Sequence, residues 1–261
     1  MGKYNTKFKL DNENNSHTQM VINTPEGSDV LEFGCSKGHV SKHFKKKGCT
    51  VTGIEIDSEM AELAKEHCES THVANIDDLD FKKLLNKQYD VITFGDVLEH
   101  LKHPGMALEY IADILKDDGK LLVSLPNITF GHHRLELLKG SLKYEASGIL
   151  DRTHVNFFDA NGAYDLFESS GYYIKDFIRI KQEVPLDYVL ETLIEAGLDD
   201  SDEAVDNIMK LRDFEVFQFY VVALKATEEN LKRIQRMRDL ENLDVIENLK
   251  KSKKKSWWKK G

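Results

Sequence analysis

A glycine-rich turn followed by a distant carboxylate gives this chain its clearest chemical potential. Gly34 and Gly38 stand directly after an apolar run, Glu55 closes the next apolar run, and Asp57 lies two residues beyond it. Glycines at the end of a strand let the backbone approach a ligand closely, and a carboxylate about 20 residues later can accept hydrogen bonds from both hydroxyls of a ribose. The pattern therefore predicts half of a nucleoside-binding α/β fold.

The spacing of this turn indicates which kind of nucleoside it binds. A dinucleotide fingerprint needs glycines at relative positions one, three and six, but Ser36 and His39 occupy the last two of these positions. Glu32, which precedes the turn, would repel a pyrophosphate, whereas a zwitterionic sulfonium ligand tolerates a carboxylate. The pattern Glu32-x-Gly34-x-Ser36-x-Gly38 resembles the first motif of class I S-adenosylmethionine-dependent methyltransferases. Ser36 departs from the usual glycine, and a serine fits only if its φ stays negative.

Two later stretches extend this resemblance. Where the family has an acid near the adenine, the chain has Asn75, whose side-chain oxygen can accept a hydrogen bond from the adenine amino group. The run 94–101, Phe-Gly-Asp-Val-Leu-Glu-His-Leu, is similar to the fourth motif, in the form shared by ubiquinone-type and sugar-type O-methyltransferases. The resemblance implies that S-adenosyl-L-methionine is the cofactor and that it is bound by Glu32, Gly34, Cys35, Ser36, Gly38, Glu55, Ile56, Asp57, Asn75, Ile76, Asp77, Gly95, Asp96, Val97 and His100.

The acids of the run 94–101 have two interpretations. The resemblance implies that Asp96 lies beside the amino group or the sulfonium of the cofactor and that His100 faces the reaction centre. Acidic residues at this point also suit the N-terminus of a helix. We assign such a capping role to Glu99 and the cofactor role to Asp96.

Histidines supply the candidates for proton transfer. Methylation of a hydroxyl requires a base that removes its proton, and histidine serves this purpose near neutral pH. His154 is the first candidate because Asp151 lies in the same loop and can orient its imidazole. His100 and His132 are further candidates, although an exposed loop position explains His132 equally well. Asp151, His154 and Asp96 are the residues that could converge on a metal ion, but no ligand spacing calls for one, so we predict none.

The last third of the chain narrows the expected acceptor. Residues 124–128, 134–140 and 148–158, together with 14–17 and the final predicted strand, look like methyltransferases found beside glycosyltransferases in bacterial cell-surface polysaccharide pathways. This resemblance covers about residues 12–225 and implies O-methylation of a sugar or a cell-envelope glycan precursor. An N- or carboxyl-methyltransferase of a small metabolite, and a cofactor-binding scaffold without catalysis, stay open as alternatives. The oligomeric state is not predicted.

The charge distribution separates the body of the chain from its C-terminal end. The net charge of −9 divides into +5 for residues 226–261 and −14 for the rest, so we expect no nucleic-acid partner. Residues 250–261 hold seven lysines and two tryptophans, which suits either contact with an anionic membrane surface or a solubilising disordered tail. The chain has three cysteines without metal spacing and no apolar run of about 20 residues, which predicts a cytoplasmic protein. If the tail contacts a membrane, the contact is expected to be peripheral and at the inner membrane face.

Alternating strands and helices must position these groups. We predict strands at 29–33, 50–56, 71–75, 89–94, 120–125, 172–179 and 215–225, and helices at 18–23, 38–47, 59–68, 105–115, 160–169, 186–196 and 201–210, with a turn at 116–119. This order predicts an α/β, Rossmann-like methyltransferase fold with a seven-stranded, mostly parallel sheet and an antiparallel edge strand. The expected organisation is an N-terminal segment (1–27), a methyltransferase domain (28–225) with a helical insertion (186–212), and a helical basic tail (226–261). The insertion is expected to cover the carboxyl edge of the sheet.

Overall fold

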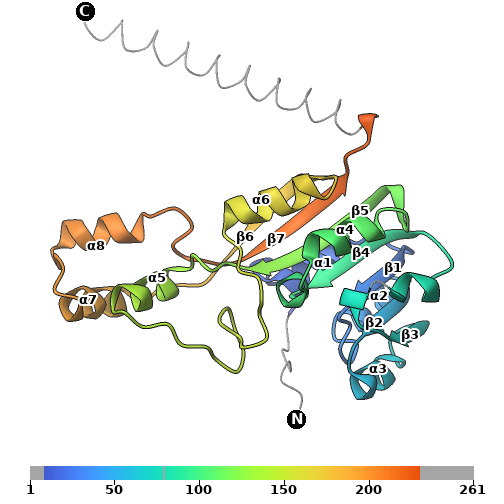
Figure 1. Ribbon diagram of the computed structural model, residues 1–261, viewed down its shortest axis with the longest axis horizontal. Coiled ribbons are helices and arrows are strands. Elements are labelled where there is room, and N and C mark those ends of the chain that lie inside the picture. The colour runs from blue at the N-terminus through green and yellow to red at the C-terminus, as the bar shows by residue number, and fades with distance from the viewer. Residues whose placement is uncertain (1–8, 79, 230–261) are drawn as a thin grey trace, which may run out of the picture.

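Seven strands form one sheet at the centre of the computed structural model, which describes residues 9–78 and 80–229 (Figure 1). The strands lie in the order β3-β2-β1-β4-β5-β7-β6. β7 runs antiparallel to both of its neighbours, and the other neighbouring strands pair in parallel. This arrangement confirms the predicted seven-stranded, mostly parallel α/β fold. The strands are β1 Asp29–Phe33, β2 Thr50–Glu55, β3 Ser70–Val73, β4 Tyr89–Gly95, β5 Leu115–Pro126, β6 Tyr172–Lys181 and β7 Val216–Lys225.

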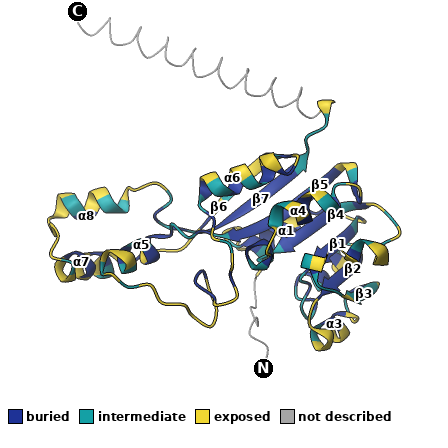
Figure 2. Ribbon diagram, viewed as in Figure 1, coloured by how far each residue is buried: buried dark blue, intermediate teal, exposed yellow. Residues whose placement is uncertain are grey.

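Helices cover both faces of the sheet because successive strand residues point to opposite sides. In β1, Val30 packs in the apolar layer shared with α1 (Ser16–Asn23), α2 (Ser41–Lys46) and α3 (Ser58–Ala64). Leu31 packs in the opposite layer, shared with α4 (Pro104–Ile111) and α6 (Ala160–Ser169). Figure 2 shows the central strands as mostly buried, whereas most residues of the edge strands β3 and β6 are intermediate or exposed. Three short 3₁₀ helices complete this part of the fold: η1 Ile76–Asp78, η2 Asp80–Leu84 and η3 Leu98–His100.

A separate helical lobe lies beyond the carboxyl end of β5 (Figure 1). It consists of α5 (Gly131–Leu138), α7 (Leu186–Glu195) and α8 (Asp202–Met209), and these helices share their own apolar core around Phe130, Leu193 and Phe214. The two helices within residues 186–212 therefore pack on α5 and on each other.

The structure differs from the sequence-based expectation in two elements. α5 lies in residues 127–159, for which no helix was predicted, because its eight residues include two adjacent histidines that obscure the apolar period. The predicted turn 116–119 lies inside β5, which continues through a bulge where its pairing passes from Tyr89–Leu115 to Val91–Lys120. In addition, α2 begins three residues later than predicted, and α3 ends four residues earlier.

Parts of the predicted terminal segments fall outside the described residues. Residues 1–8 of the N-terminal segment and 230–261 of the basic tail belong to this group, so the predicted membrane contact stays a prediction. Within 9–78 and 80–229, no helix combines the length and the apolar character needed to cross a bilayer.

Candidate functional site

The turn after β1 is shaped by backbone conformations that favour glycine. Gly34 has a φ of 67° and Gly38 a φ of 79°. A Cβ atom on Gly34 would lie 2.6 Å from Cγ2 of Val97, so a larger residue would collide with the loop after β4. Ser36 has a φ of 46°, which contradicts the expected negative value. The turn therefore keeps the left-handed conformation that glycine usually supplies, at the cost of local strain.

Glu55 holds this turn through backbone amides. One carboxylate oxygen accepts a hydrogen bond from the Ser36 amide (2.8 Å), and the other accepts from the amides of Ile56 (2.8 Å) and Asp57 (3.0 Å). The carboxylate is thus fixed between the two loops in which nucleoside contacts were predicted. Ile56 presents an apolar side chain that is 68% exposed beside it, so this corner offers both polar and apolar contacts.

Glu32 lies beneath the turn as a buried carboxyl group. It is 6% exposed and accepts a hydrogen bond from the hydroxyl of Ser41 at the start of α2. Burial raises the pKa of the Glu32 carboxyl to about 8. Cys35 points into the core, where a Cβ on Gly53 would lie 2.7 Å from its Sγ, so only the backbone of Cys35 is placed to meet a ligand.

We expect stability to depend on the protonation of Glu32. Between about pH 4.5 and 8 the folded carboxyl keeps a proton that the unfolded one has lost, so raising the pH favours the unfolded state. The free energy of unfolding of the wild type should fall by up to about 1.4 kcal/mol per pH unit in this window relative to Glu32→Gln. Urea unfolding of both proteins in the absence of ligand checks this difference. Parallel stability curves for the two proteins would contradict it.

The loop after β4 places Asp96 at the carboxyl edge of the sheet. Asp96 has a φ of 55°, and its carboxylate accepts hydrogen bonds from the hydroxyl of Ser124 (2.8 Å) and from the side-chain amide of Gln218. Its amide in turn donates to the Ser124 hydroxyl (3.0 Å). Side chains from β5 and β7 therefore orient this carboxylate, and capping of the following helix is not its structural role. Gly95, just before it, lies against the side chain of Met20 in α1.

The remaining predicted cofactor residues divide into turns and caps. Asn75 accepts a hydrogen bond from the Asp77 amide (3.1 Å), and a carboxylate oxygen of Asp77 accepts from the Lys102 amide (2.9 Å). Ile76 between them is 8% exposed and packs in the main core. Asp57 caps α3 through the amides of Glu59 and Met60, which is the capping role considered from the sequence.

Glu99 and His100 converge with His154, which lies 55 residues after Glu99 in the sequence. Nε2 of His154 lies 3.9 Å from Oε1 of Glu99, and the two imidazole rings are 4.5 Å apart between centroids. The amides of Val155 and Asn156 both donate to the carbonyl of Glu99, at 2.9 and 3.0 Å. These bonds dock the loop after α5 onto η3. Burial, with some contribution from His154, lowers the pKa of His100, which favours its neutral form.

Three expectations for this region need correction. Glu99 does not cap a helix, because its carboxylate is 1% exposed and lies against the histidines. Asp151 does not orient His154: it accepts bonds from the amide and hydroxyl of Thr153, whereas Nδ1 of His154 faces the carbonyl of Ile149 at 2.8 Å. The convergence considered for a metal, between Asp151, His154 and Asp96, is replaced by Glu99, His100 and His154.

His132 belongs to a different part of the molecule. It lies in α5 and stacks on Tyr188 of α7, with 4.9 Å between ring centroids and 20° between ring planes. The structure thus gives it a packing role in the helical lobe. The candidates chosen from the sequence for the reaction centre did not include Glu99. Its position directly before His100 was the signal that could have identified it.

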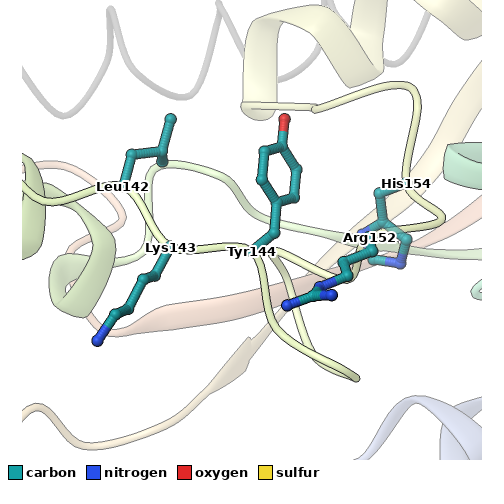
Figure 3. Close-up of a pocket in the computed structure, with 5 residues that line it drawn as sticks. All are labelled: Leu142, Lys143, Tyr144, Arg152 and His154. Carbon is teal, nitrogen blue, oxygen red and sulfur yellow. The ribbon is translucent and has the colours of Figure 1, made fainter.

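A surface pocket of about 540 Å³ opens beside the histidines (Figure 3). Its lining comes from the loop between α5 and α6, and in the view of Figure 3 the charged ends of Lys143 and Arg152 extend to the same side of that loop. Tyr144 is 49% exposed and offers a free ring face. The pocket thus combines two cations with an aromatic surface. Its lining residues are Leu142, Lys143, Tyr144, Arg152 and His154.

Comparison with known protein families and curated proteins places this site in context. Residues 15–175, more than half of the chain, match a family model described as a methyltransferase domain. The ubiquinone biosynthesis O-methyltransferase of Glaesserella parasuis serovar 5 is 33% identical over 111 residues, which is 40% of this chain and 47% of that protein. The enzyme of the same name from Coxiella burnetii (strain Dugway 5J108-111) is 32% identical over 41% of this chain and 47% of its own length. The chain spans about half the length of the curated relatives it matches.

Solved structures share the fold at low sequence identity. A SAM-dependent methyltransferase from Archaeoglobus fulgidus superposes with a TM-score of 0.55 and 18% identity, over 79% of this chain and 90% of that one. The magnesium protoporphyrin IX methyltransferase of Synechocystis PCC 6803, crystallised with SAH, gives a TM-score of 0.53 and 15% identity over 80% and 81%. At these identities the likeness shows the fold alone.

Proposed function

The chain belongs to the methyltransferase domain family, and from that membership we propose that it is an S-adenosylmethionine-dependent methyltransferase acting on a hydroxyl group. The O-directed part of the proposal draws on the curated relatives, which are named O-methyltransferases. The finer part concerns the acceptor: a sugar or cell-envelope glycan precursor that carries negative charge. The pocket containing Lys143 and Arg152 beside His154 is the observation that carries it.

The residues after β1 and β2 fit the cofactor. Glu55 accepts three hydrogen bonds from backbone amides, two of them on one oxygen, so the oxygen bonded to the Ser36 amide keeps a lone pair for a ribose hydroxyl. The exposed side chain of Ile56 can cover one face of the adenine. The buried Glu32 is mostly protonated at neutral pH, because its pKa is raised to about 8. A positively charged amino group near it would favour the carboxylate form. When bound, S-adenosylmethionine supplies a methyl group that its sulfonium already activates.

The histidines can take up the proton of the acceptor. The backbone carbonyl of Ile149 accepts the Nδ1–H of His154, which leaves the lone pair of this imidazole on Nε2. That nitrogen can accept the proton of an acceptor hydroxyl lying in the adjoining pocket. At 9% exposure His154 excludes bulk water from one side of the acceptor. Alignment of the acceptor oxygen is then the main task of the pocket.

Lys143, Arg152 and Tyr144 indicate the chemistry of the acceptor. Arginine and lysine recognise phosphate groups, and an aromatic ring packs well on the apolar face of a sugar. All three lie on one loop around the pocket (Figure 3). A nucleotide-linked sugar offers a phosphate, a sugar face and free hydroxyls in one molecule, so this class matches the lining residues best.

We expect methylation of nucleotide-linked sugars and a specific role for Arg152 in binding them. The purified chain is incubated with S-adenosylmethionine and with separate panels of nucleotide-linked sugars, amines and carboxylic acids, and products are identified by mass spectrometry. Arg152→Ala should raise KM for an anionic sugar about tenfold and leave kcat within about twofold, because a charge-assisted hydrogen bond contributes about 1.5–3 kcal/mol. Lys46→Ala, on the exposed side of α2, is the matched control.

Other outcomes of this experiment decide between the alternatives. Product formed only from amines or carboxylic acids would replace the hydroxyl acceptor. Binding of S-adenosylhomocysteine without turnover of any panel would favour a scaffold that has lost catalysis. A KM that Arg152→Ala leaves unchanged would remove the anionic acceptor from the proposal.

A further inference from the structure

Glu99 carries a carboxyl group that is buried next to two histidines. It is 1% exposed, and neither of its carboxylate oxygens has a hydrogen-bond partner among the residues the structure describes. Burial raises the pKa of Glu99, and the nearby carboxylates of Asp96 and Asp151 raise it further. Buried carboxylates in proteins are normally hydrogen-bonded, paired or coordinated to a metal ion. A positively charged ligand beside Glu99 would satisfy both oxygens and take the place of the proton.

Two imidazoles face this carboxylate in orientations that backbone carbonyls fix. Nδ1 of His154 lies 2.8 Å from the Ile149 carbonyl, and Nδ1 of His100 lies 3.2 Å from the Thr153 carbonyl. Each ring therefore has its Nε2 left for another partner. Histidines that bind metals almost always donate their other ring N–H to a carbonyl or carboxylate in this way.

The distance between Glu99 and His154 argues against a direct hydrogen bond. Nε2 of His154 is 3.9 Å from Oε1 of Glu99, which is too long for a hydrogen bond. One ligand atom from each of Glu99, His100 and His154 lies within 4.8 Å of the other two. Ligand atoms around a zinc-like ion with bonds of about 2.1 Å are about 3.4 Å apart, so small side-chain rotations close the set.

We propose that Glu99, His100 and His154 bind one divalent transition-metal ion. Two imidazoles and one carboxylate favour ions such as Zn²⁺, Co²⁺ or Fe²⁺ over Mg²⁺ and Ca²⁺, which prefer ligand sets made only of oxygen. Three protein ligands leave at least one coordination position open, as in catalytic zinc sites. The surrounding negative charge of Asp96 and Asp151 matches the charge of the ion.

The role of this ion rests on the proposed function, although its binding does not. His154 also lines the pocket with Arg152, so an ion held by these ligands would lie beside the space assigned to the acceptor. A metal-bound hydroxyl loses its proton far more easily than a free one. Nε2 of His154 would then hold the ion instead of taking up the proton, and the proton of a coordinated acceptor hydroxyl would pass to solvent. An acceptor with two adjacent hydroxyls could chelate such an ion.

Metal titration of the full-length, untagged protein tests this site directly. The protein is stripped with a chelator and titrated with Co²⁺ alone, whose absorbance reports its ligands, and then with Zn²⁺ by calorimetry. Glu99→Gln and His154→Ala should bind at least ten times more weakly than the wild type, since even outer-shell changes cost 10–100-fold. Glu62→Gln on the exposed face of α3 and His72→Ala in β3 are matched controls, each expected to bind one equivalent.

The outcomes separate this proposal from the proposed function. Affinity for S-adenosylhomocysteine is measured on the same preparations. Saturable metal binding that both site variants weaken supports the metal site, whether or not the nucleoside binds. No saturable binding by the wild type, or equal binding by His154→Ala, overturns the site and leaves the methyltransferase assignment standing. The wild-type titration decides even if Glu99→Gln fails to fold.

Discussion

Replacing Glu55 with glutamine is expected to lower the affinity for S-adenosylhomocysteine by at least about 100-fold, or about 2.7 kcal/mol. The wild-type carboxylate accepts hydrogen bonds from three backbone amides and keeps one lone pair for the proposed contact with a ribose hydroxyl. A glutamine presents an NH₂ group to amides that also donate, so it loses bonds on both sides. Hydrogen bonds to a charged group contribute about 1.5–3 kcal/mol each, and the variant forfeits more than one of them.

The measurement is calorimetric titration with S-adenosylhomocysteine, and circular dichroism shows that the variant is folded. Glu59→Gln, one turn into α3 and exposed, is the matched control and should bind like the wild type. An unchanged affinity in Glu55→Gln would mean that the nucleoside lies elsewhere. If the wild type preferred NAD to S-adenosylhomocysteine, the assignment of an S-adenosylmethionine site would be wrong.

The fold was predictable because its information is local. Short apolar runs that alternate with helical segments determine a mostly parallel sheet, and the seven predicted strands all occur in the structure. α5 was missed because its stability comes from packing in the helical lobe, through residues such as Leu135, and its own apolar period is weak. The turn predicted at 116–119 failed for the opposite reason: local turn residues were overridden by pairing with β4.

The site was predictable only where its residues lie at the ends of consecutive strands. Gly34, Gly38 and Glu55 belong to two consecutive strand ends, so their spacing in the sequence determines their spacing in the structure. The prediction of a negative φ for Ser36 was wrong because the Glu55 carboxylate accepts a hydrogen bond from the Ser36 amide and holds the loop.

Glu99 and His154 show what sequence patterns could not provide. They meet through a loop whose amides at 155 and 156 dock on the carbonyl of Glu99. No sequence period connects Glu99 with His154, 55 residues later, and a glutamate near the start of a helix is normally interpreted as a cap. Asp151 illustrates the same limit: proximity in the sequence suggested that its carboxylate orients the imidazole of His154, whereas that carboxylate accepts bonds from Thr153 and the Ile149 carbonyl orients the imidazole.

Replacing His154 with alanine is expected to lower kcat by about 10²–10⁴-fold and to leave the affinity for S-adenosylhomocysteine unchanged. The alanine removes the Nε2 atom that lies beside Glu99 in the pocket proposed for the acceptor, whereas the proposed nucleoside contacts lie after β1 and β2. His132→Ala is the informative comparison, because that ring stacks on Tyr188 in the helical lobe, and its kcat should stay within about twofold. Comparable losses in both variants would return His132 to the catalytic set.

Chemical rescue of His154→Ala separates the two chemical roles of this residue. Exogenous imidazole can enter the open pocket and replace a missing base, so restored turnover by imidazole alone, in metal-free buffer, would assign proton transfer to Nε2. If Nε2 instead holds an ion, imidazole restores activity only when Zn²⁺ or Co²⁺ is also present, because Glu99 and His100 alone bind the ion weakly. Both results require the same side chain at the same place, between a buried carboxylate and the acceptor pocket. They differ only in whether Nε2 of His154, beside that carboxylate, takes up a proton or binds a metal ion.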